Sequence, residues 1–413
     1  MPSHANSLLP TSIKTRILHL RASQFVGGPE KQILHHAGHV RSREREIWIG
    51  SFRDGSARPA LLDRAEELGL PTLEFSSGRF DLRTIFELAR AIRQHHISVL
   101  CTHGYKANII GWAAARLTGC AQIAYARGWT SENWRIRFYD KIDRFVLHRT
   151  EWVVCVSRAQ ADRLTARRRR KRAPVVIPNT ALLVGESVTL PIARQPIRKS
   201  LGLPEDAFLV GAAGRLSVEK GHLYLLRAIP ALIRHIPKLQ VLLLGEGAER
   251  KRFEHEVAQL GLQHCVRLIG FVDDVRPWIQ ACDVLVNPSL SEGVPNVVLE
   301  AMALGTPVVA TSVGGVPDLL QDLSSGLIVP SGNSVALANA IHIVFASPAM
   351  RVRLTQNAQT RAQDFSPERQ NQRLLELYAA ALQTAQAKWQ STPIFRPHAD
   401  NRPDYEFPSA VSQ

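Results

Sequence analysis

Short apolar runs alternate with longer helical patterns twice along this chain of 413 residues. The first series extends from Lys14 to about Val156, and the second extends from Phe208 to about Phe345. Strands that alternate with helices predict a parallel sheet covered by helices. The chain is also too long for one ordinary hydrophobic core. The sequence therefore predicts an α/β protein with two doubly wound, Rossmann-like domains.

The segment between the two series is rich in proline and has no clear periodicity. We place the linker there, and we expect the last residues, rich in Pro, Ser, Gln and charge, to be disordered. The expected organisation is a tail at 1–14, a first domain at 15–185, a linker at 186–200, a second domain at 201–365, a terminal helix at 366–387 and a tail at 388–413.

The positive charge of the chain belongs to its first half. The formal net charge is +15, and residues 1–200 contribute 33 basic and 16 acidic side chains against 18 and 20 in residues 201–413. Such a field suggests an anionic partner, which could be a membrane surface, a phosphorylated acceptor or nucleic acid.

The densest basic segment is 163–172, with seven Lys and Arg side chains. It has no interleaved aromatic residues that could stack on bases, which disfavours nucleic acid. Clustered cations beside an anionic bilayer contribute about 1 kcal/mol each. The segment could also be only a solvated helix end.

The five cysteines are scattered and lack zinc-site spacing, which favours a reducing cytoplasm. Residues 1–15 do not resemble a signal peptide, and no apolar run reaches the length of a membrane span. We therefore expect a cytoplasmic protein, held peripherally at the inner face of the cell membrane.

Two glutamates, Glu292 and Glu300, flank a predicted helix start in Ser-Glu-Gly-Val-Pro-Asn-Val-Val-Leu-Glu. Pro295 suits the first helical turn, which places Glu292 in a loop and Glu300 about two turns inside the helix. The positive end of the helix lies between them and suits an anionic ligand with hydroxyls on both sides. Taken alone, each glutamate is more often a solvated surface charge.

Residues 208–330 resemble the nucleotide-sugar-binding half of family 4 retaining glycosyltransferases, which have the GT-B fold. The matching segments are Gly-Ala-Ala-Gly-Arg-Leu-Ser-Val-Glu-Lys-Gly (211–221), Leu-Leu-Leu-Gly-Glu-Gly (242–247), Val-Arg-Leu-Ile-Gly-Phe-Val (266–272), the glutamate segment and Gly-Thr-Pro-Val-Val-Ala-Thr-Ser-Val-Gly-Gly-Val-Pro-Asp (305–318). They occur in the family order and at the family spacing. A looser similarity extends from about residue 15 to residue 385.

The resemblance implies catalytic roles for Arg215, Lys220 and Glu292. The two cations would stabilise the charge that develops on a leaving diphosphate. Glu292 would hold hydroxyls of the donor sugar, and Glu300 would accept from both ribose hydroxyls, which suits a carboxylate. The remaining donor-binding positions would be Gly27, Gly28, Gly293, Val294, Pro295, Asn296 and Val297, chiefly through the backbone.

Three further features of the sequence fit more than one role. Gly27 and Gly28 could allow close approach of a donor or could only form a turn that needs positive φ. His103, expected just after a strand, could orient the acceptor or be a satisfied loop residue. Arg127 occupies a place where many relatives have a histidine, and it could bind a phosphate or an acidic sugar.

The resemblance implies transfer of a sugar from a nucleoside diphosphate, expected to be UDP, to a saccharide or lipid-linked acceptor in cell-envelope polysaccharide or lipopolysaccharide biosynthesis. No Asp-x-Asp motif and no glycosidase-like carboxylate pair is evident, so we expect no metal and no cofactor. An anionic membrane surface is an expected partner and nucleic acid is not. The alternatives are a sugar-nucleotide epimerase or hydrolase of the same fold, and a non-catalytic nucleotide-sugar or nucleic-acid binding module.

Overall fold

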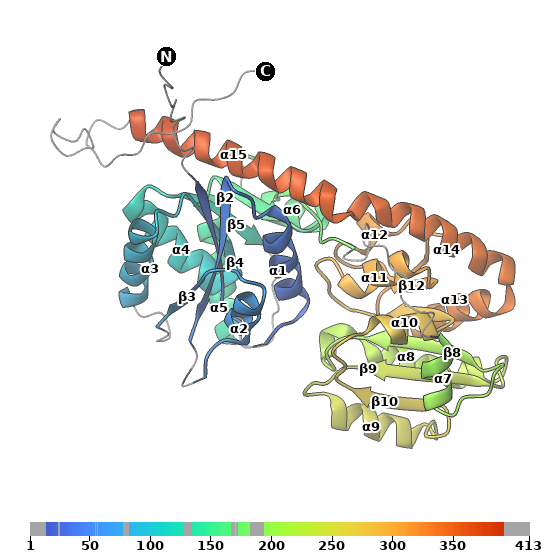
Figure 1. Ribbon diagram of the computed structural model, residues 1–413. Helices are drawn as coiled ribbons and strands as arrows, with labels where there is room; N and C mark the ends of the chain where they lie inside the picture. Colours follow the sequence, from blue (N-terminus) through green and yellow to red (C-terminus); the bar gives the residue numbers. More distant parts are fainter. Residues whose placement is uncertain are drawn as a thin grey trace, which may run out of the picture. The chain divides into compact units, whose positions relative to one another are not determined.

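The computed structural model describes residues 14–23, 25–53, 55, 57–76, 82–126, 134–166, 170, 172–181 and 194–391. The described chain divides into two compact units. Unit 1 takes its residues from Met1–Val154, Arg170–Arg172 and Leu374–Gln413, and unit 2 takes its residues from Cys155–Arg169 and Ala173–Arg373. Figure 1 shows the elements of both units along the chain.

The first sheet has the strand order β3-β2-β1-β4-β5-β6-β7. The strand β1 lies inside the sheet and pairs in parallel with both β2 and β4. The strands are β1 (Thr15–Arg21), β2 (Arg45–Phe52), β3 (Thr72–Phe75), β4 (Val99–His103), β5 (Ala121–Ala126), β6 (Trp152–Cys155) and β7 (Val175–Val176). The order reverses between β1 and β4, which is where open α/β sheets bind ligands beyond the carboxyl ends of their strands.

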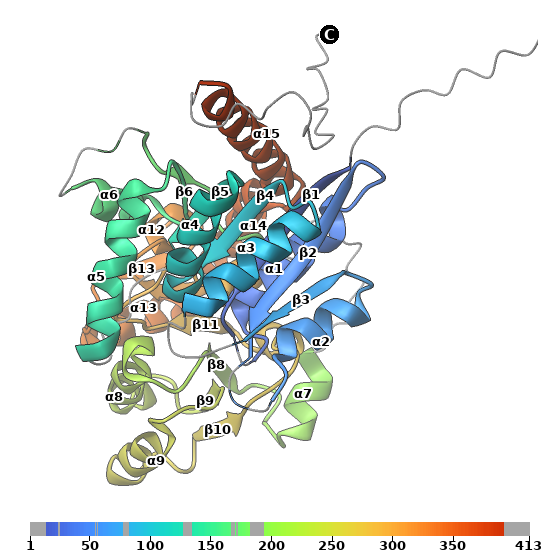
Figure 2. The ribbon, with the colours of Figure 1, turned by 90° about the vertical axis from the view of Figure 1, so that its left-hand side faces the viewer.

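Helices cover both faces of the first sheet. They are α1 (Gly28–Val40), α2 (Ala60–Glu67), α3 (Leu82–Gln94), α4 (Tyr105–Thr118), α5 (Trp134–Arg149) and α6 (Arg158–Thr165). The helices α3 and α4 lie on the face opposite α1 (Figure 1). Figure 2 shows α3, α4 and α5 as neighbouring helices.

The second sheet repeats this pattern within unit 2. Its order is β10-β9-β8-β11-β12-β13, and β8 pairs in parallel with β9 and β11. The strands are β8 (Phe208–Ala213), β9 (Leu239–Leu244), β10 (Val266–Gly270), β11 (Val284–Asn287), β12 (Val308–Thr311) and β13 (Leu327–Val329). The strand order reverses between β8 and β11.

The helices of unit 2 bury both faces of this sheet. They are α7 (Arg194–Ser200), η1 (Val218–Lys220), α8 (His222–Ile233), α9 (Arg250–Gln259), α10 (Arg276–Ala281), α11 (Asn296–Leu304), α12 (Val316–Leu319), α13 (Ser334–Ala346), α14 (Pro348–Ala362) and η2 (Gln363–Phe365). The last helix, α15 (Pro367–Ser391), begins in unit 2 and continues in unit 1. Along β8, Val210 and Ala212 pack in one core cluster while Leu209 packs in another. This double burial explains why the strands are continuously apolar.

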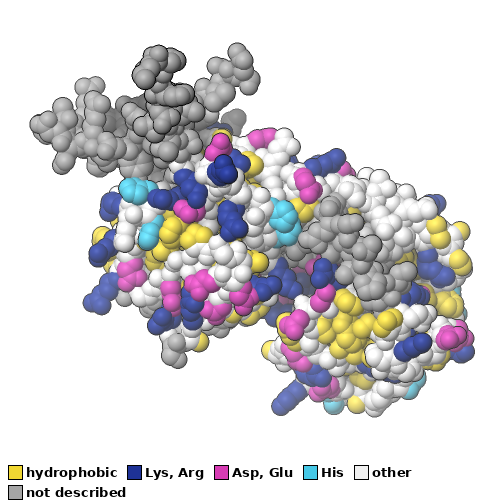
Figure 3. Space-filling view, viewed as in Figure 1, with side chains coloured by type: hydrophobic (Ala, Val, Ile, Leu, Met, Phe, Trp, Pro, Cys, Tyr) yellow, Lys and Arg dark blue, Asp and Glu magenta, His cyan; other side chains and the backbone are white. Residues whose placement is uncertain are grey.

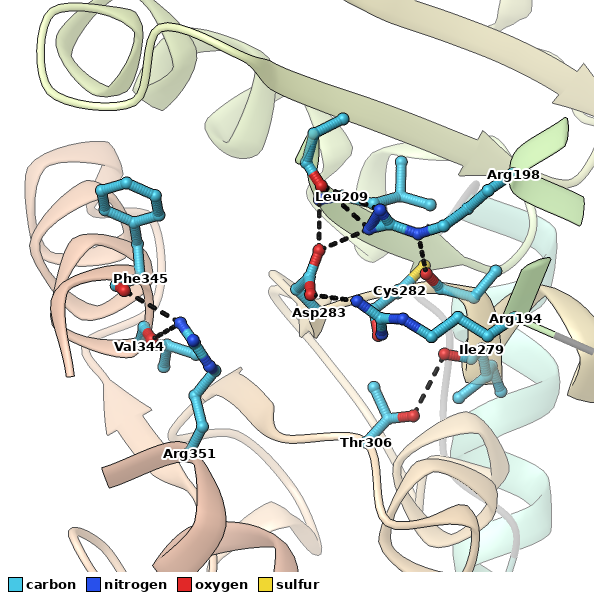
Figure 4. A network of polar contacts seen from close by, with 12 residues as sticks. Arg194, Arg198, Leu209, Ile279, Cys282, Asp283, Thr306, Val344, Phe345 and Arg351 are labelled. Carbon is cyan, nitrogen blue, oxygen red and sulfur yellow. Dashed lines mark hydrogen bonds and ion pairs between the residues drawn. The ribbon is translucent and has the colours of Figure 1, made fainter. Parts of the chain in front are cut away.

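A buried ion network fastens α7 to the amino-terminal edge of β8 and β11. Asp283 accepts from Arg194 Nη2 at 2.6 Å, from Arg198 Nη2 at 2.7 Å and from the Leu209 N–H at 2.7 Å. The Arg198 side chain is only 4% exposed and also donates to the carbonyl groups of Ala281 and Ala207. Figure 4 shows Asp283 between the two guanidinium groups. The charges are therefore fully paired, as burial requires.

Several expected boundaries differ in the structure. The helix α7 begins at Arg194, inside the expected linker, because Arg194 and Arg198 are held by Asp283. Residues 155–169 and 173–181 group with unit 2, although we expected them in the first domain. The expected terminal helix is α15, and it continues to Ser391, past the expected start of the tail at 388. Its residues are divided between the units after Arg373.

The charge pattern of unit 1 is more mixed than its net charge suggests. On the face shown in Figure 3, cations and carboxylates of unit 1 lie side by side. Of the basic segment, Arg170 donates to the carbonyl groups of Leu147 and Thr150 at the end of α5, and Arg172 stacks on the Trp152 ring at 3.9 Å. These two cations therefore contact other parts of the protein and stabilise its fold.

Among the described residues, no single helix has the length and apolar character that a bilayer span requires. Within the described ranges, α13 taken together with the helical stretch Pro348–Lys388 is the one pair that passes such a test, and this pair is bent by 102°.

Candidate functional site

Two loops leave neighbouring strands of unit 2 at the point where the strand order reverses. One follows β8 and runs from Gly214 to Gly221, and the other follows β11 and runs from Pro288 to Pro295. The N–H of Leu290 donates to the carbonyl of Glu219 at 2.8 Å, which ties the loops together. A Cβ on Gly221, where φ is +64°, would lie 2.1 Å from the Pro288 carbonyl oxygen. Glycine is therefore required for this approach.

A third loop, after β12, closes on the second. The N–H of Gly315 donates to the carbonyl of Gly293 at 2.6 Å. A Cβ on Gly314, at φ +55°, would lie 1.9 Å from the carbonyl oxygen of Glu292. The backbone around Glu292 is thus held from both sides, which restricts where its carboxylate can point.

Lys220 and Glu292 meet directly, although 72 positions separate them. The Lys220 Nζ lies 2.7 Å from Oε1 of Glu292, whose side chain is only 8% exposed. The Ser289 hydroxyl also donates to this oxygen, at 2.6 Å. The structure therefore brings together two of the three residues for which we expected catalytic roles.

Arg215, the third such residue, lies on the same loop as Lys220. Its Nη2 lies 2.5 Å from Oε1 of Glu219, and half of its side chain is exposed. Burial opposes ionisation of Glu219, but hydrogen bonds from Ser217 and Arg215 keep the pKa of its carboxyl group below the usual value. Glu219 is therefore charged at neutral pH and partly balances Arg215.

The helix α11 begins at Asn296, with Pro295 as its N-cap at φ −73° and ψ 114°. Pro295 thus precedes the first turn in which we expected it. Asn179 Nδ2 donates to Asn296 Oδ1 at 2.7 Å and to the Val294 carbonyl at 3.1 Å. Val294 is buried in the hydrophobic core, so it can offer a ligand only its backbone, and the half-buried Val297 packs against the same core.

Glu300 is half-buried in α11. It is the fifth residue of the helix, so it lies little more than one turn from the helix start rather than two. One helix therefore separates the two glutamates, with its first-turn N–H groups between them.

The glycine pair lies in unit 1, at the start of α1. Gly27 has φ −94°, so positive φ is not the reason for a glycine there. A Cβ at this position would lie 2.9 Å from the Phe25 ring. The Gly27 N–H donates to Glu30 at 3.0 Å, and Glu30 also pairs with Arg21. Burial opposes ionisation of Glu30, yet Arg21 holds the pKa of its carboxyl group below the usual value. Gly28 is the first residue of α1.

His103 is the last residue of β4 rather than a loop residue, and it is buried. Its Nε2 lies 3.0 Å from His19 Nδ1, and its ring stacks on Tyr125. The chain of contacts continues from His19 Nε2 to the Tyr378 hydroxyl at 3.2 Å and from that hydroxyl to His36 Nε2 at 2.7 Å. His103 is thus part of a buried polar cluster that includes α15. Arg127 lies outside the described residues.

His222 supplies a pH-dependent term to the stability of unit 2. It is the first residue of α8, and burial, with a smaller contribution from Lys220, lowers the pKa of its imidazole to about 4. The unfolded chain binds this proton near pH 6.5, so protons favour unfolding between these values. We expect the free energy of unfolding to fall by about 3 kcal/mol from pH 7 to pH 4 through this group.

Denaturant unfolding of the unaltered protein and of His222→Gln measures this contribution. The difference in unfolding free energy between the two should shrink as the pH falls. The control is His264→Gln, since His264 is exposed. Parallel curves for His222→Gln and the unaltered protein would contradict the prediction.

Two protein-family models match this chain, one in its first half and the other largely in its second half. Residues 27–180 match the model described as "Glycosyl transferase 4-like domain", and residues 193–361 match "Glycosyl transferases group 1". The chain belongs to the family 4 glycosyltransferases. HepE of Anabaena, solved in complex with UDP, aligns with a TM-score of 0.77 at 24% identity, over 89% of this chain and 100% of that chain. The predicted fold class, GT-B, and the predicted family are confirmed.

The curated relatives that this chain matches are named for different functions. A D-inositol 3-phosphate glycosyltransferase of Saccharomonospora viridis is 35% identical over 54% of this chain and 57% of the relative. The lipopolysaccharide core biosynthesis glycosyltransferase LpsE of Rhizobium meliloti is 36% identical over 44% and 53%. The chain thus spans little more than half the length of these two relatives. Another D-inositol 3-phosphate glycosyltransferase, from Streptomyces scabiei, is 26% identical over 90% of both chains.

Reasoning from the sequence missed the residues that hold the site in place. Glu219, Ser289, Asn179 and Gly314 contact the expected site residues, but each stands in a sequence context that is also common in ordinary loops. One signal in the sequence could have found part of this set. The glycine pair 314–315 follows an apolar strand, and such a pair indicates that another backbone segment passes close to it.

Proposed function

We propose that this glycosyltransferase moves a sugar, with retention of its anomeric configuration, from a UDP-linked donor to a saccharide or lipid-linked acceptor of the cell envelope. The observation that carries the proposal is the contact of Lys220 with Glu292 beside Arg215 and the start of α11. Cations and a helix N-terminus suit a diphosphate, and a held carboxylate suits sugar hydroxyls.

The choice of UDP and of an envelope acceptor draws on the relatives. HepE was solved with UDP and with UDP-glucose, and LpsE is named for lipopolysaccharide core biosynthesis. An anionic acceptor, as in the D-inositol 3-phosphate enzymes, would suit the basic excess of residues 1–200.

In the proposed mechanism, electrostatic stabilisation and positioning lower the barrier. Arg215 and Lys220 stabilise the charge that grows on the diphosphate as the anomeric bond breaks. Glu292 and the backbone of Gly293 to Asn296 hold the donor sugar, and Glu300 holds the ribose. The acceptor hydroxyl attacks from the face that the diphosphate leaves, and the departing phosphate takes its proton. Gly27 and Gly28 bind the donor in this proposal, and His103 and Arg127 belong to the acceptor or sugar side.

We propose further that transfer needs neither a metal nor a cofactor. Two cationic side chains and a helix start supply the charge stabilisation that a metal provides in other enzymes. Activity should then be unchanged when EDTA is added after dialysis, and a loss that Mg²⁺ or Mn²⁺ restores would contradict this part.

The decisive experiment offers the protein UDP-, GDP- and ADP-sugars in a thermal-shift assay, because ligands that bind only the folded state raise its apparent stability. Transfer is then measured with lipid-linked acceptors, and the anomeric configuration of the product is read by NMR. A new glycosidic bond is expected. Release of free sugar or its epimer would indicate a hydrolase or epimerase, and binding without turnover would indicate a binding module.

A membrane-facing role is proposed for α5. Its exposed residues Lys141, Arg144, Phe145 and Arg149 are spaced to share one side of the helix, and Arg149 lies over the Phe145 ring at 4.1 Å. A basic helix face with an aromatic residue suits the headgroups of anionic lipids. We place the protein peripherally at the inner face of the cell membrane, in the cytoplasm.

Vesicle sedimentation tests this placement. The protein should sediment with phosphatidylglycerol vesicles and much less with phosphatidylcholine vesicles, and salt should weaken the binding. The double substitution Lys141→Glu, Arg144→Glu should abolish it. The same charge reversal at two exposed cations of unit 2, Lys251 and Arg252, is the control. Equal binding by both double variants would contradict a role for α5.

A further inference from the structure

Oε1 of Glu292 accepts hydrogen bonds from two donors on the protein, whereas its other carboxylate oxygen, Oε2, accepts no hydrogen bond from the described residues. The donors are Lys220 Nζ at 2.7 Å and the Ser289 hydroxyl at 2.6 Å. Ser289 is completely buried, and its own carbonyl accepts from the hydroxyls of Thr311 at 2.5 Å and Ser331 at 3.2 Å. These contacts hold the backbone of Ser289 in place, so its hydroxyl donates to Glu292 from a fixed position.

The Ser289 hydroxyl faces two oxygens but carries only one proton. Oε1 of Glu292 lies at 2.6 Å and Oδ1 of Asn287 lies at 3.3 Å. The closer contact, to a charged acceptor, takes the proton because hydrogen bonds to ions are the stronger ones. The Asn287 oxygen is then left against the lone pairs of the serine oxygen.

The side-chain amide nitrogen of Asn287 also lacks a hydrogen-bond partner. This residue ends β11, its side chain is 2% exposed, and its Nδ2 has no hydrogen-bond partner within the described chain. Turning the amide by 180° places Nδ2 against the Ser289 oxygen, which has lone pairs to accept. This orientation gives the serine oxygen a donor and ends the contact between two acceptors.

We propose that Asn287 and Ser289 are positioning residues for Glu292. In this hydrogen-bond relay, Asn287 Nδ2 donates to the Ser289 oxygen and the Ser289 hydroxyl donates to Oε1 of Glu292. The Lys220 ammonium group is the second donor to Oε1. Oε1 therefore accepts hydrogen bonds from protein groups, and Oε2 is the oxygen that accepts a hydrogen bond from a hydroxyl of the donor sugar. This inference deepens the proposed function and rests on Glu292 contacting the donor sugar.

Calorimetric titration with UDP and with the UDP-sugar that the unaltered protein binds best tests the relay. Ser289→Ala should weaken binding of the UDP-sugar about tenfold while the affinity for UDP, which has no sugar, changes less than about twofold. Asn287→Asp should have the same selective effect, because a carboxylate at this position cannot donate to Ser289.

The control is Ser347→Ala, which removes a hydroxyl that caps α14 in the same unit. It should lower the melting temperature and leave both affinities unchanged. Equal loss of UDP and UDP-sugar binding in Ser289→Ala, or no loss of either, would overturn the relay while leaving the proposed function intact. Failure of the unaltered protein to bind any nucleotide sugar would overturn the proposed function and the relay with it.

Discussion

Replacing Lys220 by alanine is expected to lower the kcat of sugar transfer by about 10²–10³, the usual effect of removing one group that stabilises transition-state charge. Its side chain is three-quarters buried and its Nζ lies 2.7 Å from Oε1 of Glu292, so the substitution removes a cation that the protein holds close to this carboxylate. The change also leaves the Glu292 carboxylate without its cation. Steady-state kinetics with a UDP-sugar measure the effect, and UDP binding by calorimetry should weaken in parallel.

The matched control for this substitution is Lys238→Ala. Lys238 also pairs with a single carboxylate, that of Asp206, but at the opposite edge of the same sheet and with more than half of its side chain exposed. It should retain full activity. Lys220→Arg, which keeps a cation, should recover part of the loss. Lys220→Ala with near-normal kcat would show that this residue does not act on the leaving diphosphate.

Replacing Asp283 by alanine is expected to lower the free energy of unfolding of unit 2 by about 3–5 kcal/mol. The substitution leaves the guanidinium of Arg198, 4% exposed, without a counter-ion and removes the acceptor for the Leu209 N–H. Asp283 is the only carboxylate among the residues drawn in Figure 4. Denaturant unfolding followed by circular dichroism measures the loss.

The control for Asp283 is Asp206→Ala in the same unit. Asp206 is exposed and pairs only with the exposed Lys238, and such surface pairs contribute little to stability. Its unfolding midpoint should stay close to that of the unaltered protein. A loss in Asp283→Ala no larger than in this control would mean that Arg198 finds solvent or another partner when the aspartate is absent.

The elements of the fold were largely predictable from local sequence. Continuous apolar strands such as 208–213 give strong signals, because burial on both faces of a sheet leaves no room for polar residues. The glycine that ends α11, Gly305, is a second strong signal. The expected boundaries failed where long-range contacts decide them. The helix α7 exists inside the expected linker because Asp283, more than 80 positions away, holds its two arginines.

For the candidate site too, local sequence predicted some features and long-range contacts decided the others. The types of residue in Gly-Arg-x4-Lys-Gly and in the glutamate segment indicated cations and carboxylates suited to a nucleotide sugar, and their order along the chain identified the family. The sequence could not show that Lys220 and Glu292 contact each other, or that Ser289 occupies one oxygen of that carboxylate.

What the sequence determined by itself is therefore the family, the alternation of strands and helices and the chemical groups available to the site. Tertiary structure alone decided which groups are paired, which oxygen of Glu292 remains open and that His103 is buried in a polar cluster. The physical reason is distance. Helix and strand patterns arise between neighbours in the chain, whereas a charge meets its partner only when parallel strands bring loops from distant positions to the same edge of a sheet.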